Sequence, residues 1–255
     1  MSHSKRIDAS LGPKGTAHER VEIFRLIFWS WARESGIYEK FSVDSKFGVV
    51  HLNDISNKNF RRGPGAIAKD LGLSPRTVEG VLREFRERIA KSPRGYTNQL
   101  NKIVHIDTWT YRPHLTKHPA PRPTILGMMS NDGQLRLFEI FAESLNDIYP
   151  LVEAHLAKGS RLITSGLKVH SVLKDQTHIH LERFTSDKHL RDWLSQKGLP
   201  SLFDFWEVVE DDIHCARGVR DQHFLPRVRE AELRWEFRKS PRIDLYRHAI
   251  ALMNP

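Results

Sequence analysis

The stretch KIVHIDTW, residues 102–109, contains one acidic residue, Asp107, within an apolar run of β-strand character. Successive side chains of a strand point to opposite faces, so Val104 and Ile106 are expected on one face and Ile103, His105 and Asp107 on the other. A carboxylate in a buried strand is costly unless a cation or a hydrogen-bond donor meets it. The sequence leaves three partners open for Asp107: a metal ion held with other carboxylates, a basic side chain, or water.

The segments after residue 109 have the patterns of strands and helices in alternation. A hairpin is expected over residues 124–141, because two apolar runs flank the turn signal Asn131-Asp132-Gly133. Further along the chain we expect a helix over 146–159, a strand over 161–165, a helix over 167–175, a strand over 177–184 and mostly helices from 187 to 253. Three strands in a meander followed by alternating elements predict an RNase H-like α/β domain, in which helices flank a mixed sheet.

Residues 61–90, RRGPGAIAKDLGLSPRTVEGVLREFRERIA, predict two helices joined by a tight turn. Ser74 has the chemistry of an N-cap, and Pro75 suits the first helical position after it. The apolar residues expected to face the core are Ala66, Ile67, Ala68 and Leu71 in the first helix and Val78, Val81, Leu82, Phe85 and Ile89 in the second. This is the arrangement of a DNA-binding helix-turn-helix, in which the start of the second helix enters the major groove.

The residues expected to contact DNA are mostly basic and lie just before the first helix, on it, and at the start of the second helix. They are Arg61, Arg62, Lys69, Ser74, Arg76, Thr77 and Arg83, with Gly80 also on the exposed side. Residues 58–94 hold ten Lys and Arg against four Asp and Glu, and so carry much of the net charge of the chain. The alternative is an ordinary helical hairpin with a solvated basic face.

The whole chain is basic: it has 40 Lys and Arg against 31 Asp and Glu, a net charge of +9 and a pI near 9.7. Such a charge favours polyanions as partners, of which nucleic acid is the commonest. The single cysteine, Cys215, excludes an internal disulfide framework and a cysteine-built zinc site. No apolar run is long enough to span a membrane, and the polar N-terminus lacks the apolar core of a secretory signal. We therefore expect a cytoplasmic, nucleoid-associated protein.

The predicted domain organisation has three parts. Residues 1–17 form a flexible lead, residues 18–95 a helical region that contains the helix-turn-helix, and residues 100–255 the RNase H-like domain with its C-terminal helices. The predicted fold class is therefore α/β, with a helical N-terminal region ahead of the mixed sheet. No role for residues 36–60 follows from the sequence.

Residues 62–250 resemble small bacterial insertion-sequence transposases, which carry a DDE-type RNase H-like domain behind a zinc ribbon and a helix-turn-helix. Asp107 follows a short apolar strand, as the first catalytic acid of that family does. Near the C-terminus, HFLPRVREAELRWEFRKSPR (223–242) is similar to the closing helix of the family, with matching residues at His223, Glu230, Arg234, Trp235 and Arg238. The resemblance implies a centre in which three carboxylates hold two divalent metal ions.

Two of the three implied carboxylates are missing from this chain. The second acid should follow Thr164, where Ser165 stands, and alignment on Trp206 puts Phe203 in the place of the third. Asp107 alone cannot hold two metal ions, so we expect it to be vestigial. The acids that would rebuild part of a site, if they turned inward, are Asp204, Glu207, Glu210 and Asp211. The zinc ribbon is also missing, because residues 1–60 contain no cysteine.

These patterns predict a DNA-binding protein derived from an insertion-sequence transposase, without cleavage activity, that acts as a regulator or an architectural factor. Double-stranded DNA is the expected partner, and a homo-oligomer is compatible with the sequence. No cofactor, metal ion, membrane or small-molecule substrate is expected. One alternative is an active, magnesium-dependent transposase with an atypical site. The other is a helix-turn-helix transcriptional regulator whose C-terminal domain binds a ligand or dimerises.

Overall fold

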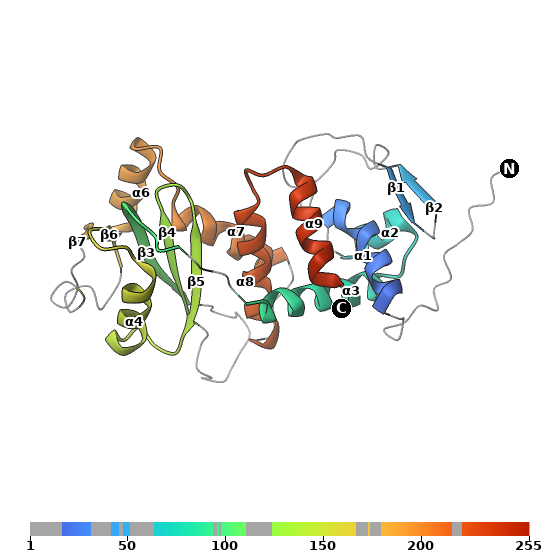
Figure 1. Ribbon diagram of the computed structural model, residues 1–255, viewed down its shortest axis with the longest axis horizontal. Coiled ribbons are helices and arrows are strands. Elements are labelled where there is room, and N and C mark those ends of the chain that lie inside the picture. Colours follow the sequence, from blue (N-terminus) through green and yellow to red (C-terminus); the bar gives the residue numbers. More distant parts are fainter. Residues whose placement is uncertain are drawn as a thin grey trace. The chain divides into compact units, whose positions relative to one another are not determined.

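The computed structural model describes residues 17–31, 42–45, 48–51, 64–93, 96, 98–110, 124–166, 173, 180–215 and 221–254 (Figure 1). The chain divides into two compact units, one made of Met1–Ser92 with Leu225–Pro255 and the other of Pro93–Phe224. We predicted that residues 225–255 belong to the same domain as the sheet, whereas in the structure they belong to the first unit.

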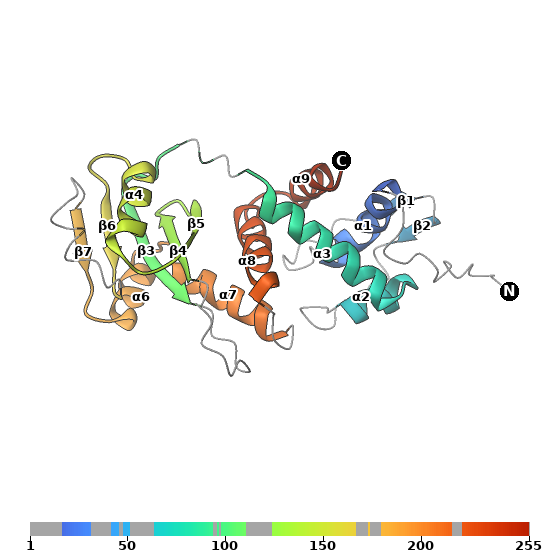
Figure 2. The ribbon, with the colours of Figure 1, turned by 90° about the horizontal axis from the view of Figure 1, so that it is seen from below.

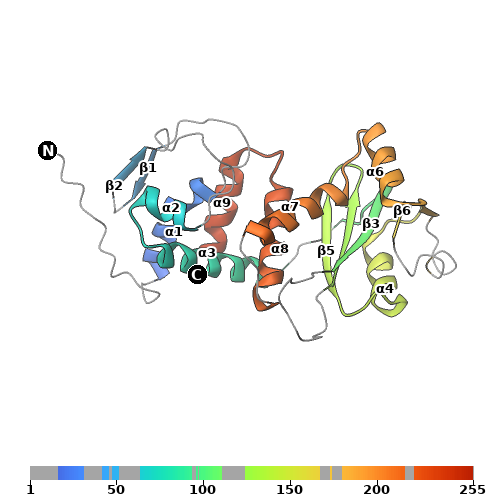
Figure 3. The same cartoon turned by 180° about the vertical axis from the view of Figure 1, so that it is seen from behind.

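The first unit is helical apart from a short antiparallel hairpin. Its elements are α1 (Ala17–Trp31), β1 (Ser42–Ser45), β2 (Gly48–His51), α2 (Pro64–Leu71), α3 (Pro75–Lys91), most of α8 (Asp221–Glu236) and α9 (Arg242–Met253). Figure 3 shows α1, α2, α3 and α9 gathered together.

The turn between α2 and α3 has the predicted chemistry. Ser74 caps α3, because its Oγ accepts a hydrogen bond from the Thr77 N–H at 3.0 Å, and Pro75 begins the helix. Gly72 has a φ of 65°, a left-handed conformation that glycine adopts without strain. The residues predicted to face inward from α3 are all buried: Val78, Val81, Leu82, Phe85 and Ile89.

One apolar core joins helices from both ends of the chain. Its buried members include Phe24, Ile27 and Phe28 of α1, Ile67 and Ala68 of α2, Phe85 and Ile89 of α3, and Leu245, Ala249, Ile250 and Met253 of α9. Ala66, which was predicted to face this core, is exposed, because the short helix α2 buries a narrower side than its sequence indicated. The apolar side of α9 packs with the N-terminal helices, which explains why the C-terminal residues lie in the first unit.

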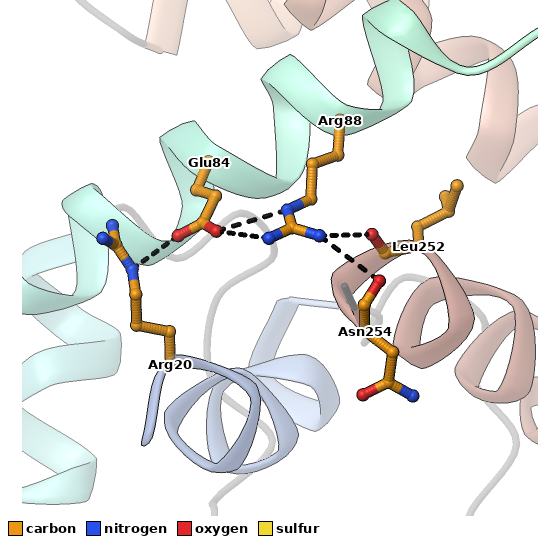
Figure 4. Close-up of polar contacts among 5 residues, drawn as sticks. All are labelled: Arg20, Glu84, Arg88, Leu252 and Asn254. Atoms are coloured by element: carbon orange, nitrogen blue, oxygen red, sulfur yellow. Dashed lines mark hydrogen bonds and ion pairs between the residues drawn. The ribbon is translucent and has the colours of Figure 1, made fainter. Parts of the chain in front are cut away.

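Polar contacts also hold the end of α9 against α3 (Figure 4). Glu84 on α3 pairs with Arg20 of α1 at 2.5 Å and with Arg88 at 2.9 Å. The Nη1 of Arg88 donates to the carbonyl oxygens of Leu252 and Asn254 at 3.3 and 3.4 Å. A cation at the C-terminus of a helix meets carbonyl groups that have no partner within the helix, so the contact is favourable.

The second unit is built around a mixed sheet, which confirms the predicted α/β class. Its elements are β3 (Ile103–Thr110), β4 (Thr124–Ser130), β5 (Leu135–Ile140), α4 (Leu145–His155), β6 (Arg161–Thr164), β7 (His180–Arg183), α6 (Asp187–Gln196) and α7 (Leu202–Cys215). Among the described residues the order across the sheet is β5-β4-β3-β6-β7. The pairs β3–β4 and β4–β5 are antiparallel, and the pairs β3–β6 and β6–β7 are parallel. The strand that carries Asp107 is therefore central.

The two faces of the sheet carry the side chains that the alternation along β3 predicted. Val104 and Ile106 are buried in a cluster with residues of α4. On the opposite face, His105 contacts Phe203 of α7. Figure 2 shows α4 and α6 on opposite sides of the sheet. Asp107, two residues after His105, therefore lies on the face that α6 and α7 cover.

The remaining predictions of secondary structure are met in part. The hairpin at 124–141 is present, and the helix predicted over 146–159 is α4. In the region of the helix predicted over 167–175, the structure describes only Leu173. Residues 1–16 of the predicted flexible lead lie outside the described residues, and its last residue, Ala17, is the first residue of α1. In the described stretches, no helix combines the length and the apolar character needed to cross a membrane.

Candidate functional site

Helix α3 presents one side to solvent, opposite the side that it buries. Arg76, Gly80, Arg83 and Glu87 follow one another at helical spacing along this outer side. The three charged residues are exposed and Gly80 is partly exposed. Lys69 on α2 is exposed as well. Three of the predicted DNA contacts, two on α3 and one on α2, are therefore accessible.

The other predicted DNA contacts differ in their placement. Ser74 and Thr77 are half-buried, and their hydroxyl oxygens are 2.7 Å apart, within hydrogen-bond distance. Both hydroxyl groups are therefore engaged at the N-terminus of α3 and are less available to an outside partner. Arg61 and Arg62 lie outside the described residues.

Two of the four arginines of α3 are engaged within the protein. Arg86 forms an ion pair with Glu230 of α8, and both side chains are largely buried. The carboxylate of Glu230 also pairs with Arg234 at 2.6 Å, so two arginines share this buried acid. Arg88 is held by Glu84, as described above. The arginines that α3 offers to an outside partner are therefore Arg76 and Arg83, which are exposed.

The carboxyl group of Asp107 has a pKa raised to about 7. The main cause is burial, which removes water from the charged form. The backbone N–H of Thr108 and the indole of Trp206 lower this pKa, and the carboxylates of Asp187 and Glu143 raise it. The buried indole nitrogen of Trp206 forms no hydrogen bond of standard geometry, so it acts on Asp107 as a nearby dipole. Asp107 is therefore partly protonated at neutral pH.

The two carboxylates near Asp107 were not identified from the sequence. Asp187, the first residue of α6, accepts a hydrogen bond from the Ser165 hydroxyl at 2.6 Å. Glu143, which follows β5, accepts a hydrogen bond from the Thr108 hydroxyl. Of the partners left open for Asp107, no basic side chain of the described residues is among the groups that shift its pKa, and the two neighbouring carboxylates raise that pKa. The sequence signal for Asp187 was its position at the start of a helix that follows a strand parallel to β3.

The residues at the implied metal positions do not fit a two-ion centre. Ser165, at the place of the second acid, is buried and offers a hydroxyl group. Phe203, at the place of the third, is also buried, and its ring centroid lies 4.9 Å from that of His105. Within the part of the chain that the structure describes, no group of three or more His, Cys, Asp or Glu side chains is placed to hold a metal ion.

The acids on α7 do not rebuild the missing ligands. Asp204 and Glu207 lie 4.0 and 2.6 Å from the Arg191 guanidinium of α6. Glu210 accepts a hydrogen bond from the indole N–H of Trp109 on β3 at 2.8 Å. All three side chains are exposed. The side chain of Asp211 lies outside the described ones.

An aromatic stack covers the side of the sheet on which Asp107 lies. Trp109 stacks on Trp206 of α7 and on Phe224, with ring centroids 5.8 and 5.5 Å away. Gly127, which pairs with Asp107 across β3 and β4, leaves room for this arrangement. A Cβ at Gly127 would lie 2.8 Å from Cζ2 of Trp206. The close packing of Trp206 on this glycine helps to bury the carboxyl group.

His105 shares this face and is buried and uncharged. Burial lowers its pKa to about 3. The backbone N–H of Leu202 donates to its Nδ1 at 3.2 Å, so we assign the ring proton to Nε2, which has no hydrogen-bond partner among the described residues. A protonated Nε2 is not a metal ligand, and the uncharged ring of His105 offers no cation to balance the charge of Asp107 at neutral pH.

Comparison with models of protein families and with curated proteins gave no match. The fold, the outer side of α3 and the surroundings of Asp107 are therefore the grounds on which a function is assigned. The outer side of α3 has accessible cations, and the surroundings of Asp107 have carboxylates. The first therefore suits an anionic partner and the second a cationic one.

Proposed function

We propose that this chain is a double-stranded DNA-binding protein related to insertion-sequence transposases, and that it binds DNA without cleaving it. The observation that carries this proposal is the outer side of α3, where Arg76 and Arg83 stand exposed on a helix that a capped three-residue turn joins to α2. In a helix-turn-helix protein the first turns of the second helix contact base edges in the major groove. Lys69 on α2 would then meet the phosphate backbone.

The sheet supports the transposase relationship. Its strand order and directions are those expected of an RNase H-like domain: three antiparallel strands in a meander, then two strands parallel to the first. Asp107 lies on the central strand, where such a domain carries its first acid. The proposal therefore treats β3–β7 with their helices as an RNase H-like domain derived from a transposase.

The loss of cleavage activity follows from the surroundings of Asp107. Divalent magnesium requires several anionic or neutral oxygen ligands in a regular arrangement. Here a serine hydroxyl and a phenylalanine ring stand at two of the three implied positions, and Asp107 itself is partly protonated near pH 7. A protein with these properties would act on the chromosome as a regulator, as an architectural factor or as a competitor of an active transposase.

Binding of the full-length protein to duplex DNA tests this function. Selection of bound duplexes from a random pool should enrich a sequence motif, and affinity for that motif is then measured by fluorescence anisotropy. Arg76→Ala should weaken specific binding by about 1–3 kcal/mol if the side chain contacts a base. Arg247→Ala, which removes an exposed arginine from α9, is the matched control. Equal losses in the two variants would show that α3 contributes only general charge.

A metal-dependent nuclease is the second candidate, and the proximity of Asp187 and Glu143 to Asp107 favours it. The experiment is incubation of the selected duplex with the protein in Mg²⁺ or Mn²⁺, followed by analysis of strand breaks. Cleavage that disappears in Asp107→Asn would establish the nuclease and refute the absence of cleavage. The absence of strand breaks with a duplex that the protein binds would refute this second candidate.

A further inference from the structure

Gly80 lies near the middle of α3, on the outer side between Arg76 and Arg83. A Cβ added at Gly80 would meet no atom of the residues that the structure describes within 4 Å. Its φ is not positive, so the backbone there is one that any residue adopts. Neither backbone conformation nor packing therefore requires glycine at this position.

Two other glycines show what a structural requirement looks like in this chain. Gly72 has a positive φ in the turn before α3, and Gly127 lies under the ring of Trp206. Gly80 has neither feature, and glycine in the middle of a helix is less stable than alanine. Without a side chain at this partly exposed position, the backbone of α3 is open to close approach from the solvent side.

We propose that Gly80 is the point of closest approach between α3 and duplex DNA, and that Arg76 and Arg83 contact base edges on either side of it. This inference rests on the proposed function. Duplex DNA is the partner that fits, since residues 58–94 carry ten basic against four acidic residues and both flanking side chains are exposed cations. A side chain on the line between the two arginines would hold the helix away from the base pairs.

The spacing of the two arginines indicates what is recognised. Arg76 and Arg83 are seven residues apart, which is about 10 Å along a helix axis. This distance corresponds to about three base-pair steps of B-DNA. Arginine forms its commonest specific contact with the O6 and N7 of guanine. The preferred duplex should therefore contain two guanines about three base pairs apart.

Three variants of the full-length protein test the close approach. Gly80→Ala adds a methyl group, Gly80→Leu adds a larger side chain, and Ala66→Leu places the same side chain at an exposed position of α2. Each variant is measured for thermal unfolding and for binding to the selected duplex and to an unrelated duplex. Gly80→Ala should raise the melting temperature by about 2–4 °C, because alanine stabilises a helix.

Affinity should change in the opposite direction. Gly80→Leu should weaken binding to the selected duplex by about tenfold or more, and Gly80→Ala should weaken it by a smaller factor. Ala66→Leu should leave this affinity within about twofold of the unmodified protein, as expected for a change outside the contact. Wild-type affinity in a folded Gly80→Leu variant would overturn the close approach and leave the proposed function standing. Failure of the unmodified protein to bind any duplex would instead overturn the proposed function, and this inference with it. A selected motif without paired guanines would refute the assignment of the two arginines to bases.

Discussion

Substitution of Asp107 by asparagine should stabilise the folded protein above neutral pH. Asparagine has nearly the same shape as aspartate, so the change removes the charge while leaving the packing against Trp206 in place. In the folded chain the carboxyl group has a pKa of about 7, against 3.8 for an ordinary aspartate, because burial and two nearby carboxylates disfavour its charged form. The unfolded chain thus releases the proton of this carboxyl more readily than the folded chain.

The sign and size of the effect follow from this difference. Below about pH 4 the carboxyl is protonated in both states, and its raised pKa does not lower the free energy of unfolding. As the pH rises from 4 to 7 the free energy of unfolding decreases, because the unfolded state releases this proton more readily. Above pH 7 the decrease is complete. The two pKa values correspond to about 4 kcal/mol at most. Relaxation and water penetration reduce such penalties, so we expect a gain of about 2–4 kcal/mol for Asp107→Asn at pH 8 and almost none at pH 4.

The assay is denaturant unfolding of both proteins at intervals between pH 4 and pH 8.5. The difference between the two unfolding free energies at each pH reports the titration of Asp107 together with its charge interactions with Asp187 and Glu143, because the other titrating groups are common to both proteins. Asp192→Asn, at an exposed position of α6, is the matched control. A difference that stays constant across this pH range would refute the reasoning, and so would a carboxyl pKa near 4 for Asp107 measured by carbon NMR.

Three further substitutions test the packing that surrounds the two sites, and each is measured by denaturant unfolding. Ser74→Ala should lower the unfolding free energy by about 1 kcal/mol, because it removes the hydroxyl that caps α3. Ser74→Asn should keep most of the stability, because asparagine can also cap a helix. An equal loss in both variants would argue against the cap. Gly127→Ala should lower it by about 1–3 kcal/mol, since the new methyl group would overlap the ring of Trp206; unchanged stability would mean that the ring has room to shift. Arg86→Leu should lower it by about 1.5–3 kcal/mol, because the buried carboxylate of Glu230 would lose one of its two arginine partners and keep only Arg234. Adding Glu230→Leu should recover part of that loss if Arg86 and Glu230 act as a pair.

Features set by neighbouring residues could be predicted from the sequence. The cap at Ser74 and the five buried residues of α3 depend on local geometry and on helical spacing, and both predictions are confirmed. The alternation along β3 correctly separated His105 from Val104 and Ile106 in the same way. The mixed α/β class followed from the order of elements. The cap, the buried side of α3 and the alternation along β3 are each decided within one helix or one strand, and the fold class by the order of such elements along the chain.

Features set by distant residues could not be predicted. The pairing of Arg86 with Glu230 joins positions 144 residues apart, and no local pattern marks it. The packing of α9 on α1 and α3 likewise depends on the shape of a core built from both ends of the chain. The surroundings of Asp107 were missed for a further reason. The resemblance to transposases predicted the neighbouring acids at positions 165 and 203. The carboxylates that lie near Asp107 are instead Asp187, in the first turn of α6, and Glu143, in the segment after β5.

The protonation of Asp107 bears directly on the choice between the two candidate functions. A divalent ion at this site would have to displace the proton that the carboxyl retains near pH 7, so any metal affinity should rise steeply between pH 6 and pH 8. Binding of the ion would also reverse the pH trend described above, because a bound cation favours the charged carboxylate. If Mg²⁺ makes the unmodified protein more stable at pH 8 but leaves Asp107→Asn unchanged, the three carboxylates form a metal site. If Mg²⁺ affects neither protein, Asp107 and its two neighbouring carboxylates do not form a metal site, which is the result expected from the proposal that the chain binds DNA without cleaving it.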